Sequence, residues 1–367
     1  LSNLGKEDFV VWDARSEEEY NGVRSLAARA GHIPGAVHCE WTSLMDADRN
    51  LRIRQDADSY LASRGLTRDK IIATHCINNM TVSKAALFCA LQRLLPHHLL
   101  SRLLAPLAES RINWLKTLLI KAFIRHYQVD VSIAERTELK TYSTFNDFFT
   151  RALKPGTRPI AETPIAIVSP ADGAISQCGT ISAGELIQAK GHRYHTADLL
   201  GDKTMAEQFS NGVFATIYLS PRDYHRVHIP VAGKLRYSRY IPGRLFSVNH
   251  ATTAHQPGLF TRNERLVCVF ESERGAFVVV MVGAMLVAGI ETVWQRNYRP
   301  GQAYEERYSG DEYSFAKGDE IGRFKFGSTA IVLLPNGTRI DSNLKPGKLL
   351  KMGEVIAHFT DQETPPQ

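Results

Sequence analysis

The chain has 367 residues, of which 44 are basic and 38 are acidic, so its formal net charge is +6. Hydrophobic residues make up 44 % and charged residues 22 %, a composition that excludes an intrinsically disordered chain, and the length allows two or three domains. The five cysteines are scattered and show no CxxC or Cys/His spacing. We therefore expect no metal site and a reducing compartment.

No segment has the length of a membrane span. The longest apolar run covers residues 275–290, whereas a spanning helix takes about 20 residues. The run is rich in β-branched residues and is interrupted by Gly283, which predicts two core strands around a turn. The first ten residues lack the basic region and apolar run of a signal peptide, so we expect none.

Residues 1–90 alternate between strand-like and helix-like segments. The segment "KIIATHC" predicts a short buried strand that ends at Cys76, and a polar loop and a helical pattern follow it. This order places Cys76 at a helix N-terminus, where backbone N–H groups and the helix dipole stabilise a thiolate.

The same segment resembles the rhodanese family. The matching pieces are Asp13-Ala14-Arg15, the stretch "GHIPGA" at residues 31–36, and Cys76 at the head of "CINNMT". The resemblance implies a small α/β domain that carries sulfur as a persulfide on Cys76. Asn78 and Asn79 stand where the family usually has glycine or a basic residue, and the start of the domain looks shortened. An inert buried cysteine in a helix-capping loop is therefore the alternative.

Residues 91–127 combine leucines with most of the excess positive charge. Residues 92–127 contain six basic residues against one acidic residue, and Pro96 and Pro106 divide the segment into short helices. In the last helix, apolar residues at spacings of three and four share one face, with Trp114 beside them: Ile112, Leu115, Leu119 and Phe123. Such a helix suits the surface of an anionic membrane, and packing on its own domain or on a second subunit is the alternative.

From residue 128 onward the chain reads as strands separated by Gly and Pro turns. "KGDEIGRF" at residues 317–324 parallels "MGEVIAHF" at residues 352–359, and each predicts a Gly turn that leads into a strand. Lipoyl- and biotinyl-type β-sandwiches are built in this way. A carrier domain would need an exposed lysine at a hairpin tip, and none is evident, so we interpret the repeat as architecture.

Three stretches supply the parts of an activated hydroxyl. Asp172 lies in "SPADGAISQ", His225 and His228 lie in "YLSPRDYHRVHIP", and Ser328 follows Gly327 in "RFKFGSTAIVLL". A serine, a histidine base and an aspartate that orients it make a nucleophile. There is no G-x-S-x-G elbow, and the serine lies between two strand-forming segments. We therefore expect Ser328 to attack the carbonyl of Gly327 in its own chain, where no Cβ obstructs the approach.

Residues 92–361 resemble bacterial phosphatidylserine decarboxylases throughout. Seven motifs match in order and spacing: "SPADGAISQ", "QAKGHRYH", "YLSPRDYHRVH", "GRLFSVNH", "LFTRNERLVCVFE", "VGAMLVAGIETVW" and "GRFKFGST". The resemblance implies an α+β chain: a strand-rich decarboxylase core with barrel-sandwich-like β elements, preceded by the small rhodanese-like domain and amphipathic helices. The expected domains are residues 1–90, 91–127 and 128–367.

The resemblance also implies roles for individual residues. His228, oriented by Asp172, deprotonates Ser328, which attacks Gly327; elimination then splits the zymogen into residues 1–327 and 328–367. The new N-terminus becomes a pyruvoyl group, the covalent cofactor, which forms a Schiff base with phosphatidylserine and yields phosphatidylethanolamine and CO2. His225 serves decarboxylation and protonation. Ser247, Asn249 and His250 match the family without an assigned role.

The same resemblance implies the surroundings of the enzyme. We expect a homodimer of cleaved α and β chains, bound peripherally to the cytoplasmic side of the cell membrane, with no nucleic acid partner. A sulfur-transfer enzyme with a degenerate C-terminal part and a non-enzymatic carrier or membrane scaffold are the alternatives. The intact set of Asp172, His228 and Ser328 argues against the first alternative, and the missing carrier lysine argues against the second.

Overall fold

The computed structural model describes residues 8–14, 17–21, 32–44, 56–67, 69–75, 92, 101, 105–189, 192–284, 289–295, 298, 301–325 and 328–360. The chain divides into two compact units, Leu1–Phe88 and Cys89–Gln367. Each unit is described by itself.

The N-terminal unit is built on a parallel sheet, in the order β2-β1-β3 in its described part. β3 ends at His75, so the next residue, Cys76, follows the carboxyl end of a strand; Cys76 itself lies outside the described residues. The elements of this unit are β1 (Phe9–Asp13), α1 (Glu17–Tyr20), β2 (Val37–His38), η1 (Trp41–Leu44), α2 (Ala57–Ser63) and β3 (Ile71–His75).

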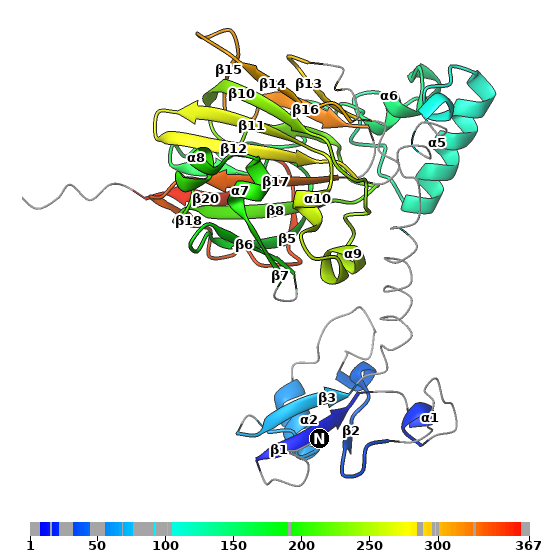
Figure 1. Cartoon of the computed structure of the whole chain (residues 1–367). Coiled ribbons are helices and arrows are strands. Elements are labelled where there is room, and N and C mark those ends of the chain that lie inside the picture. The colour runs from blue at the N-terminus through cyan, green and yellow to red at the C-terminus, as the bar shows by residue number, and fades with distance from the viewer. Residues whose placement is uncertain are drawn as a thin grey trace, which may run out of the picture. The chain divides into compact units, whose positions relative to one another are not determined.

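The second unit is organised around one large sheet, which has nine strands within the described ranges (Figure 1). All neighbouring strands in it are antiparallel. In sheet order the strands are β14 (Tyr304–Arg307), β10 (Gly233–Ile241), β11 (Arg265–Ser272), β12 (Gly275–Val282), β17 (Ser328–Leu334), β8 (Val213–Leu219), β5 (Gly173–Thr180) and β19 (Leu349–Leu350), with β15 (Ser314–Phe315) also paired to β10.

The central strands of this sheet are buried on both faces. Along β17, Ala330 and Val332 belong to one hydrophobic cluster, whereas Ile331 and Leu333 belong to another. Successive side chains of a strand point to opposite faces, so a strand covered on both sides needs a continuous apolar run. This explains the runs in β12 and β17, and the first half of the predicted strand pair at residues 275–290 is β12.

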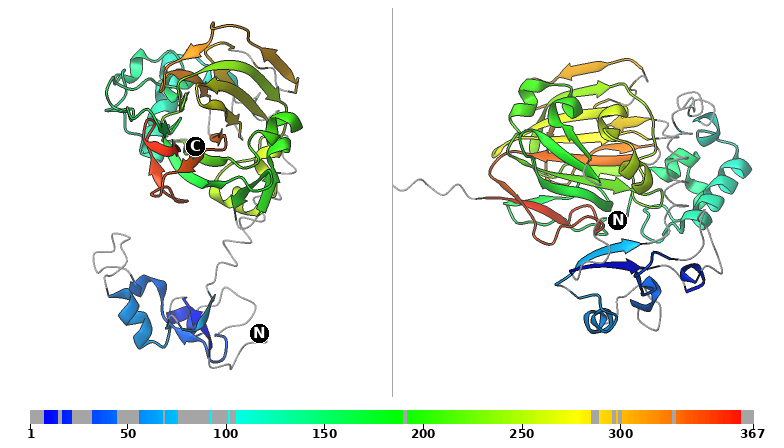
Figure 2. Two further views of the ribbon diagram at one scale, coloured as in Figure 1. Left: turned by 90° about the vertical axis from the view of Figure 1, so that its left-hand side faces the viewer. Right: turned by 60° about the horizontal axis from the view of Figure 1, so that its bottom comes forward.

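Smaller elements cover the two faces. Seen nearly along its strands, the sheet is strongly curved (Figure 2, left). Residues from α7, α8 and α10 pack in one cluster, and residues from the small sheets pack in the other. These elements are the sheets β13 (Ile290–Thr292)-β16 (Glu320–Phe324)-β9 (Arg226–His228), β18 (Thr338–Ile340)-β20 (Val355–Phe359)-β4 (Ala166–Val168) and β6 (Glu185–Ala189)-β7 (His192–His195), and the helices α7 (Thr196–Leu200), α8 (Lys203–Glu207), α9 (His250–His255) and α10 (Leu259–Arg262).

The mixed α+β class is confirmed, and the described strands form open sheets rather than a closed barrel. The predicted repeat is structural: β16 and β20 each follow a glycine turn, at Gly318 and Gly353, with φ of +90° and +92°. An added Cβ at Gly318 would lie 2.0 Å from the Ile160 side chain, and one at Gly353 would lie 2.4 Å from the Pro159 carbonyl oxygen. Both turns therefore favour glycine, because each has a positive φ and closely approaches the segment at Pro159 and Ile160, Gly318 through the Ile160 side chain and Gly353 through the backbone.

Helix α5 (Asn113–Tyr127) lies with η2 (Leu139–Thr141) and α6 (Phe145–Phe149) beyond one end of the large sheet (Figures 1 and 2). Its buried side chains are Lys116, Ile120 and Phe123. The buried Lys116 ammonium donates hydrogen bonds to the carbonyls of Lys140 and Tyr142, which compensates its burial.

The four apolar residues predicted to share one face of this helix differ in their burial. Phe123 is buried, Leu115 and Leu119 are half-buried, and Ile112 is exposed. The apolar side chains that face outward are Ile112, Trp114 and Leu118. No described helix is long and apolar enough to cross a membrane.

Candidate active site

The junction expected to break lies where the chain passes from one sheet to another. β16 ends at Phe324 in a three-stranded sheet, and β17 begins at Ser328 in the large sheet. The small residues within "RFKFGSTAIVLL" therefore mark a change of sheet rather than a bulge within one strand. Gly327 lies outside the described residues.

The segment from β8 to β9 also passes from the large sheet to the three-stranded sheet, and its two strands are the partners of β17 and β16. β8 pairs with β17, with Leu219 opposite Ser328, and β9 pairs with β16, with Arg226 opposite Arg323. The connection from β8 to β9 therefore runs antiparallel to the connection from β16 to β17. The Phe324 N–H donates to the His225 carbonyl at 2.9 Å, which places His225 beside the start of the junction.

Ser328 is fully buried, and its hydroxyl has no hydrogen-bond partner among the described residues. The Thr329 hydroxyl is in the same state. Buried hydroxyls without partners are uncommon and costly, at about 1–3 kcal/mol each. A serine held in this state at the start of a strand is available for chemistry.

His225 is also fully buried, and its ring is fixed in one tautomer. Its Nδ1 lies 2.8 Å from the Asp223 carbonyl oxygen, which can only accept, so Nδ1 carries the proton. Nε2 then carries a lone pair, and it has no partner among the described residues. Burial lowers the pKa of His225 to about 3, so the ring is neutral at pH 7. A neutral imidazole with a free lone pair is a general base.

His228 is buried too, but both of its ring nitrogens are occupied. Nδ1 lies 2.7 Å from the Gly318 carbonyl oxygen and therefore donates to it, and Nε2 lies 3.0 Å from the Tyr224 hydroxyl and therefore accepts from it. Burial lowers the pKa of His228, so this ring is also neutral at neutral pH. His228 can accept a proton from another group only after its Nε2 has lost the hydrogen bond from the Tyr224 hydroxyl.

Asp172 lies at the same end of the large sheet as Ser328. In the sheet, Leu219 of β8 is opposite Ser328 of β17. Tyr218, the neighbour of Leu219, is opposite Ala174 of β5, and β5 begins one residue earlier, at Gly173. Leu350 of β19 is opposite Gly173 on the other side. Strands are spaced by about 4.8 Å, so Gly173 lies roughly 10 Å from Ser328 across the sheet. The aspartate and the serine are thus brought to one edge from positions 156 residues apart in the sequence.

The Asp172 carboxylate is hydrogen-bonded to groups other than the His228 ring that it is predicted to orient. The carboxylate accepts from Arg158 Nε at 2.8 Å and from the Met352 N–H at 2.8 Å, and no hydrogen bond joins it to His228 among the described residues. Gly318 and Tyr224 orient the His228 imidazole instead. Asp172 is only 2 % exposed, and a buried carboxylate of this kind needs a bidentate cation, which Arg158 supplies.

The "FSVN" segment acts structurally. The Asn249 side chain caps α9 by accepting from the Thr252 N–H at 2.9 Å, and the Ser247 hydroxyl accepts from the Asn249 N–H at 3.4 Å. Buried Gln92 accepts from the Ser247 N–H at 2.7 Å, which ties the segment to the basic region of the sequence. His250 is the first residue of α9.

Three residues that support this site, Tyr224, Arg158 and Gln92, are not predictable from the sequence. Tyr224 and Arg158 nevertheless lie within or close to the matching motifs. A tyrosine and an arginine carry no spacing rule that reveals which buried group they bond. Among the described residues no cluster of His, Cys, Asp and Glu could hold a metal ion.

Comparison with known proteins adds the family. The sequence profile of phosphatidylserine decarboxylase matches residues 145–358, a further profile described as PSD matches residues 87–128, and the rhodanese-like domain profile matches residues 1–104. The phosphatidylserine decarboxylase proenzyme of Pseudomonas entomophila (strain L48) is 53 % identical over 281 residues, covering 75 % of this chain and 98 % of that protein. The proenzymes of Pseudomonas putida (strain GB-1) and Pseudomonas aeruginosa (strain LESB58) are each 53 % identical over 281 residues, covering 75 % of this chain and 98 % and 97 % of theirs.

Proposed function

Because the chain belongs to the phosphatidylserine decarboxylase family and is an enzyme of that family, with a rhodanese-like domain before the catalytic part, we propose that it breaks its own Gly327–Ser328 bond and uses the product as its cofactor. The reaction converts phosphatidylserine to phosphatidylethanolamine and CO2. The observation that supports this most is the Ser328 hydroxyl, which is buried and without a described partner at the point where the chain changes sheet.

Self-cleavage needs only groups of this chain and water. The Ser328 oxygen bonds to the Gly327 carbonyl carbon as the peptide C–N bond breaks, which turns the amide into an ester and frees the Ser328 amine. A base then removes the Ser328 α-proton, and the Gly327 carboxylate leaves with the electron pair of the C–O bond. Water replaces the remaining nitrogen, which departs as ammonia, and residue 328 ends as a pyruvoyl group. The net change consumes one water and releases one ammonia.

Residue 328 is suited to hold that group. It lies at the start of a buried strand, among side chains that exclude bulk water, and the free Nε2 of His225 belongs to the segment directly opposite the junction. A pyruvoyl carbonyl binds the amine of a substrate covalently and accepts the electron pair left when CO2 departs, a role that no side chain performs well.

The two histidines divide the proton transfers in this proposal. His225 holds a free lone pair, and its backbone bonds Phe324 at the start of the junction, which supports its role in protonating the product. His228 activates Ser328 in the intact chain, and this step requires its Nε2 to release the Tyr224 hydroxyl. Asp172 acts on both rings from a distance because its negative charge raises their pKa values against the effect of burial.

The enzyme works at an anionic membrane surface in this proposal, bound peripherally on the cytoplasmic side. Trp114 and Leu118 of α5 are 69 % and 58 % exposed, and they line a surface groove of about 620 Å3 together with Lys121 and Lys140. An exposed tryptophan and leucine between lysines are suited to insertion among lipid headgroups.

A replacement at residue 328 tests the proposal. Ser328→Ala lacks the hydroxyl, so it should remain one chain and release no CO2 from phosphatidylserine, whereas Thr329→Ala, which removes the neighbouring buried hydroxyl, should still yield two chains. The two variants are compared by denaturing electrophoresis and by release of labelled CO2. Full decarboxylation by uncleaved Ser328→Ala would contradict the proposal.

A further inference from the structure

A pocket of about 210 Å3 opens beside the candidate active site, and its wall includes Tyr224 and Asp172. We call it the Arg151 pocket. Four basic and three acidic residues line it: Arg151, Arg158, Arg222, Lys351, Asp130, Asp172 and Asp223. Leu349, which is 66 % exposed, is part of its lining as well.

Arg151 is the unusual member of this lining. Its side chain is only 2 % exposed, and its Nη2 donates to the Arg222 carbonyl at 3.2 Å and, weakly, to the Asp223 carbonyl at 3.5 Å. Its Nε and Nη1 are buried and have no hydrogen-bond partner among the described residues, and its guanidinium carbon lies 5.3 Å from the centroid of the Phe148 ring. A buried guanidinium with two unused donors is strongly unfavourable unless a ligand accepts from them.

The acidic residues of the pocket do not neutralise Arg151 by contact. Arg158 binds the Asp172 carboxylate, the Ser220 N–H donates to Asp223 at 2.7 Å, and Asp130 accepts from Ser132 at 2.9 Å. The exposed cations Arg222 and Lys351 add positive charge to the same lining. The pocket is therefore built to receive an anion.

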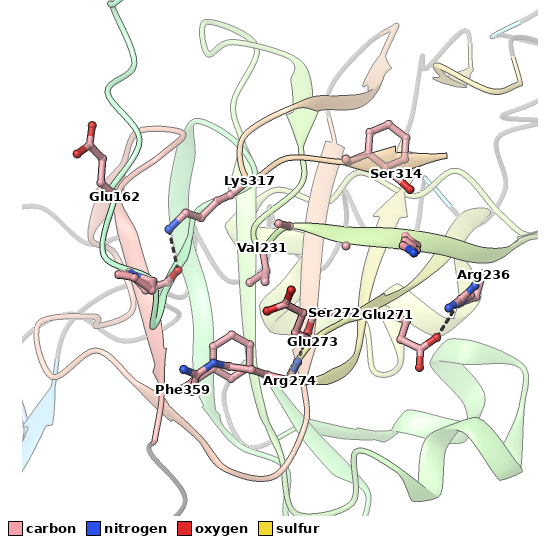
Figure 3. Close-up of a pocket in the computed structure, with 16 residues that line it drawn as sticks. Glu162, Val231, Arg236, Glu271, Ser272, Glu273, Arg274, Ser314, Lys317 and Phe359 are labelled. Carbon is pink, nitrogen blue, oxygen red and sulfur yellow. Dashed lines mark hydrogen bonds and ion pairs between the residues drawn. The ribbon is translucent and has the colours of Figure 1, made fainter. Parts of the chain in front are cut away.

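A second pocket, which is also lined by cations, differs from the Arg151 pocket in the partners of those cations. It has about 600 Å3 and lies at the opposite end of the large sheet, where β10 begins and β11 ends (Figure 3). Its four cations already have partners. Arg236 binds Glu271 at 2.6 Å, Lys234 binds Asp311 at 2.6 Å, Lys317 donates to the Thr163 carbonyl at 3.0 Å, and the Arg274 guanidinium carbon lies 5.4 Å from the centroid of the Phe359 ring. This second pocket offers no unused buried cation among those residues.

We propose that the Arg151 pocket binds the phosphodiester of the lipid headgroup, with an unused N–H group of Arg151 donating to a phosphate oxygen and with Arg222 and Lys351 adding positive charge. A charged guanidinium is a strong donor to phosphate, and exposed Leu349 provides an apolar contact for the glycerol or acyl part of the lipid. The Asp223 carbonyl accepts from both Arg151 and His225, so one backbone group connects the pocket with the histidine. This inference rests on the proposed function.

Binding is tested on the full chain carrying Ser328→Ala, so that no turnover occurs. Isothermal titration with glycerophosphoserine, a soluble phosphodiester, should give measurable binding that falls at least tenfold in Arg151→Gln and less in Arg151→Lys. Arg236→Gln, in the second pocket, is the matched control and should bind as before. The assignment to a lipid headgroup would be overturned if the protein bound inorganic phosphate but not glycerophosphoserine. It would also be overturned if Arg151→Gln bound glycerophosphoserine as tightly as the parent chain does.

Turnover gives an independent readout that does not require a buried substitution. Arg222 is exposed, so Arg222→Gln should fold normally, cleave itself at the ordinary rate and show a KM for phosphatidylserine that is raised several-fold, more than kcat is lowered. An unchanged KM in Arg222→Gln, together with unchanged binding in Arg151→Gln, overturns the pocket assignment alone. Absence of CO2 release by the wild-type chain, with glycerophosphoserine binding retained, overturns the proposed function and leaves the pocket.

Discussion

The chemistry of this site depends on which buried polar atoms are left without partners. Ser328 Oγ and His225 Nε2 are free among the described residues, whereas the nitrogens of His228 and the carboxylate of Asp172 are engaged. The residue types were predictable from the sequence because Asp, His and Ser in these motifs indicate an activated hydroxyl. Their partners were not predictable, because Arg158 and Gly318 reach them only through the tertiary fold.

A pair of alanine substitutions separates the roles of the two histidines. We expect His225→Ala to cleave itself but to lose decarboxylation by roughly 100-fold or more, because it lacks the free base that we propose for protonation of the product. We expect His228→Ala to remain a single chain, because nothing activates Ser328. Electrophoresis and CO2 release are the measurements, and exposed His195→Ala is the control. Loss of cleavage in His225→Ala would show that the division of roles is wrong.

The buried histidines also give stability a defined pH dependence. Burial lowers the pKa of His225 from 6.5 to about 3 and lowers the pKa of His228 as well. Between pH 6.5 and about 3 the unfolded chain binds protons that the folded chain excludes, so stability falls as the pH falls through this window. The slope for each group is at most about 1.4 kcal/mol per pH unit.

Urea unfolding of Ser328→Ala between pH 7.5 and 4.5 measures this slope in an uncleaved chain. Adding His225→Gln should make the plot of unfolding free energy against pH flatter below pH 6.5, because the unfolded chain then has one histidine fewer to protonate. A curve with the same slope in both proteins would contradict a buried neutral His225.

At the scale of elements, the site is made by two segments that leave the large sheet side by side. β17 and β12 were predictable because continuous apolar runs indicate strands buried on both faces. The change of sheet between β16 and β17 was not, because "RFKF" and "TAIVLL" each predict a strand and neither specifies its neighbours. The outward face of α5 was mispredicted because its apolar residues surround the helix more widely than one stripe.

A glycine fixes the spacing of strands at the site. A Cβ added at Gly173 would lie 2.3 Å from the Tyr218 carbonyl oxygen in the adjacent strand β8. Gly173→Ala should therefore push β5 and β8 apart beside Asp172, lower the free energy of unfolding by about 1–3 kcal/mol and slow self-cleavage.

Gly179→Ala is the matched control, because Gly179 lies in the same strand with a similar φ of +155°, and its nearest contact would be a Phe214 carbon at 3.9 Å. Melting curves and the time course of cleavage on a gel compare the two variants. Equal effects of both substitutions would show that the close approach at Gly173 does not matter.

At the scale of the whole molecule, a decarboxylase catalytic part, a basic helical segment and a rhodanese-like unit share one chain. β3 ends directly before Cys76, which is the position expected for a sulfur-carrying loop. The helical segment is the part that we propose to meet the membrane, since its exposed apolar side chains and its lysines lie together on α5 and η2.

Membrane binding should depend on the outward side chains of α5. We expect the double variant Trp114→Ser/Leu118→Ser to lose about tenfold or more in affinity for anionic vesicles, because two exposed apolar side chains no longer enter the lipid. Co-sedimentation with vesicles of phosphatidylglycerol and phosphatidylcholine is the measurement. Val293→Ser removes an apolar side chain of 48 % exposure elsewhere and should bind as the wild type does. Equal binding of all three proteins would exclude α5 as the contact.

The mass spectrum of the purified protein tests the central claim most directly. The account predicts two chains, residues 1–327 and 328–367, with the smaller lighter than its sequence because its first residue has lost nitrogen and carries a ketone. Borohydride should add two hydrogens to that chain and abolish decarboxylation. A single chain of 41.0 kDa that borohydride does not change, yet that decarboxylates phosphatidylserine at full rate, would contradict the account.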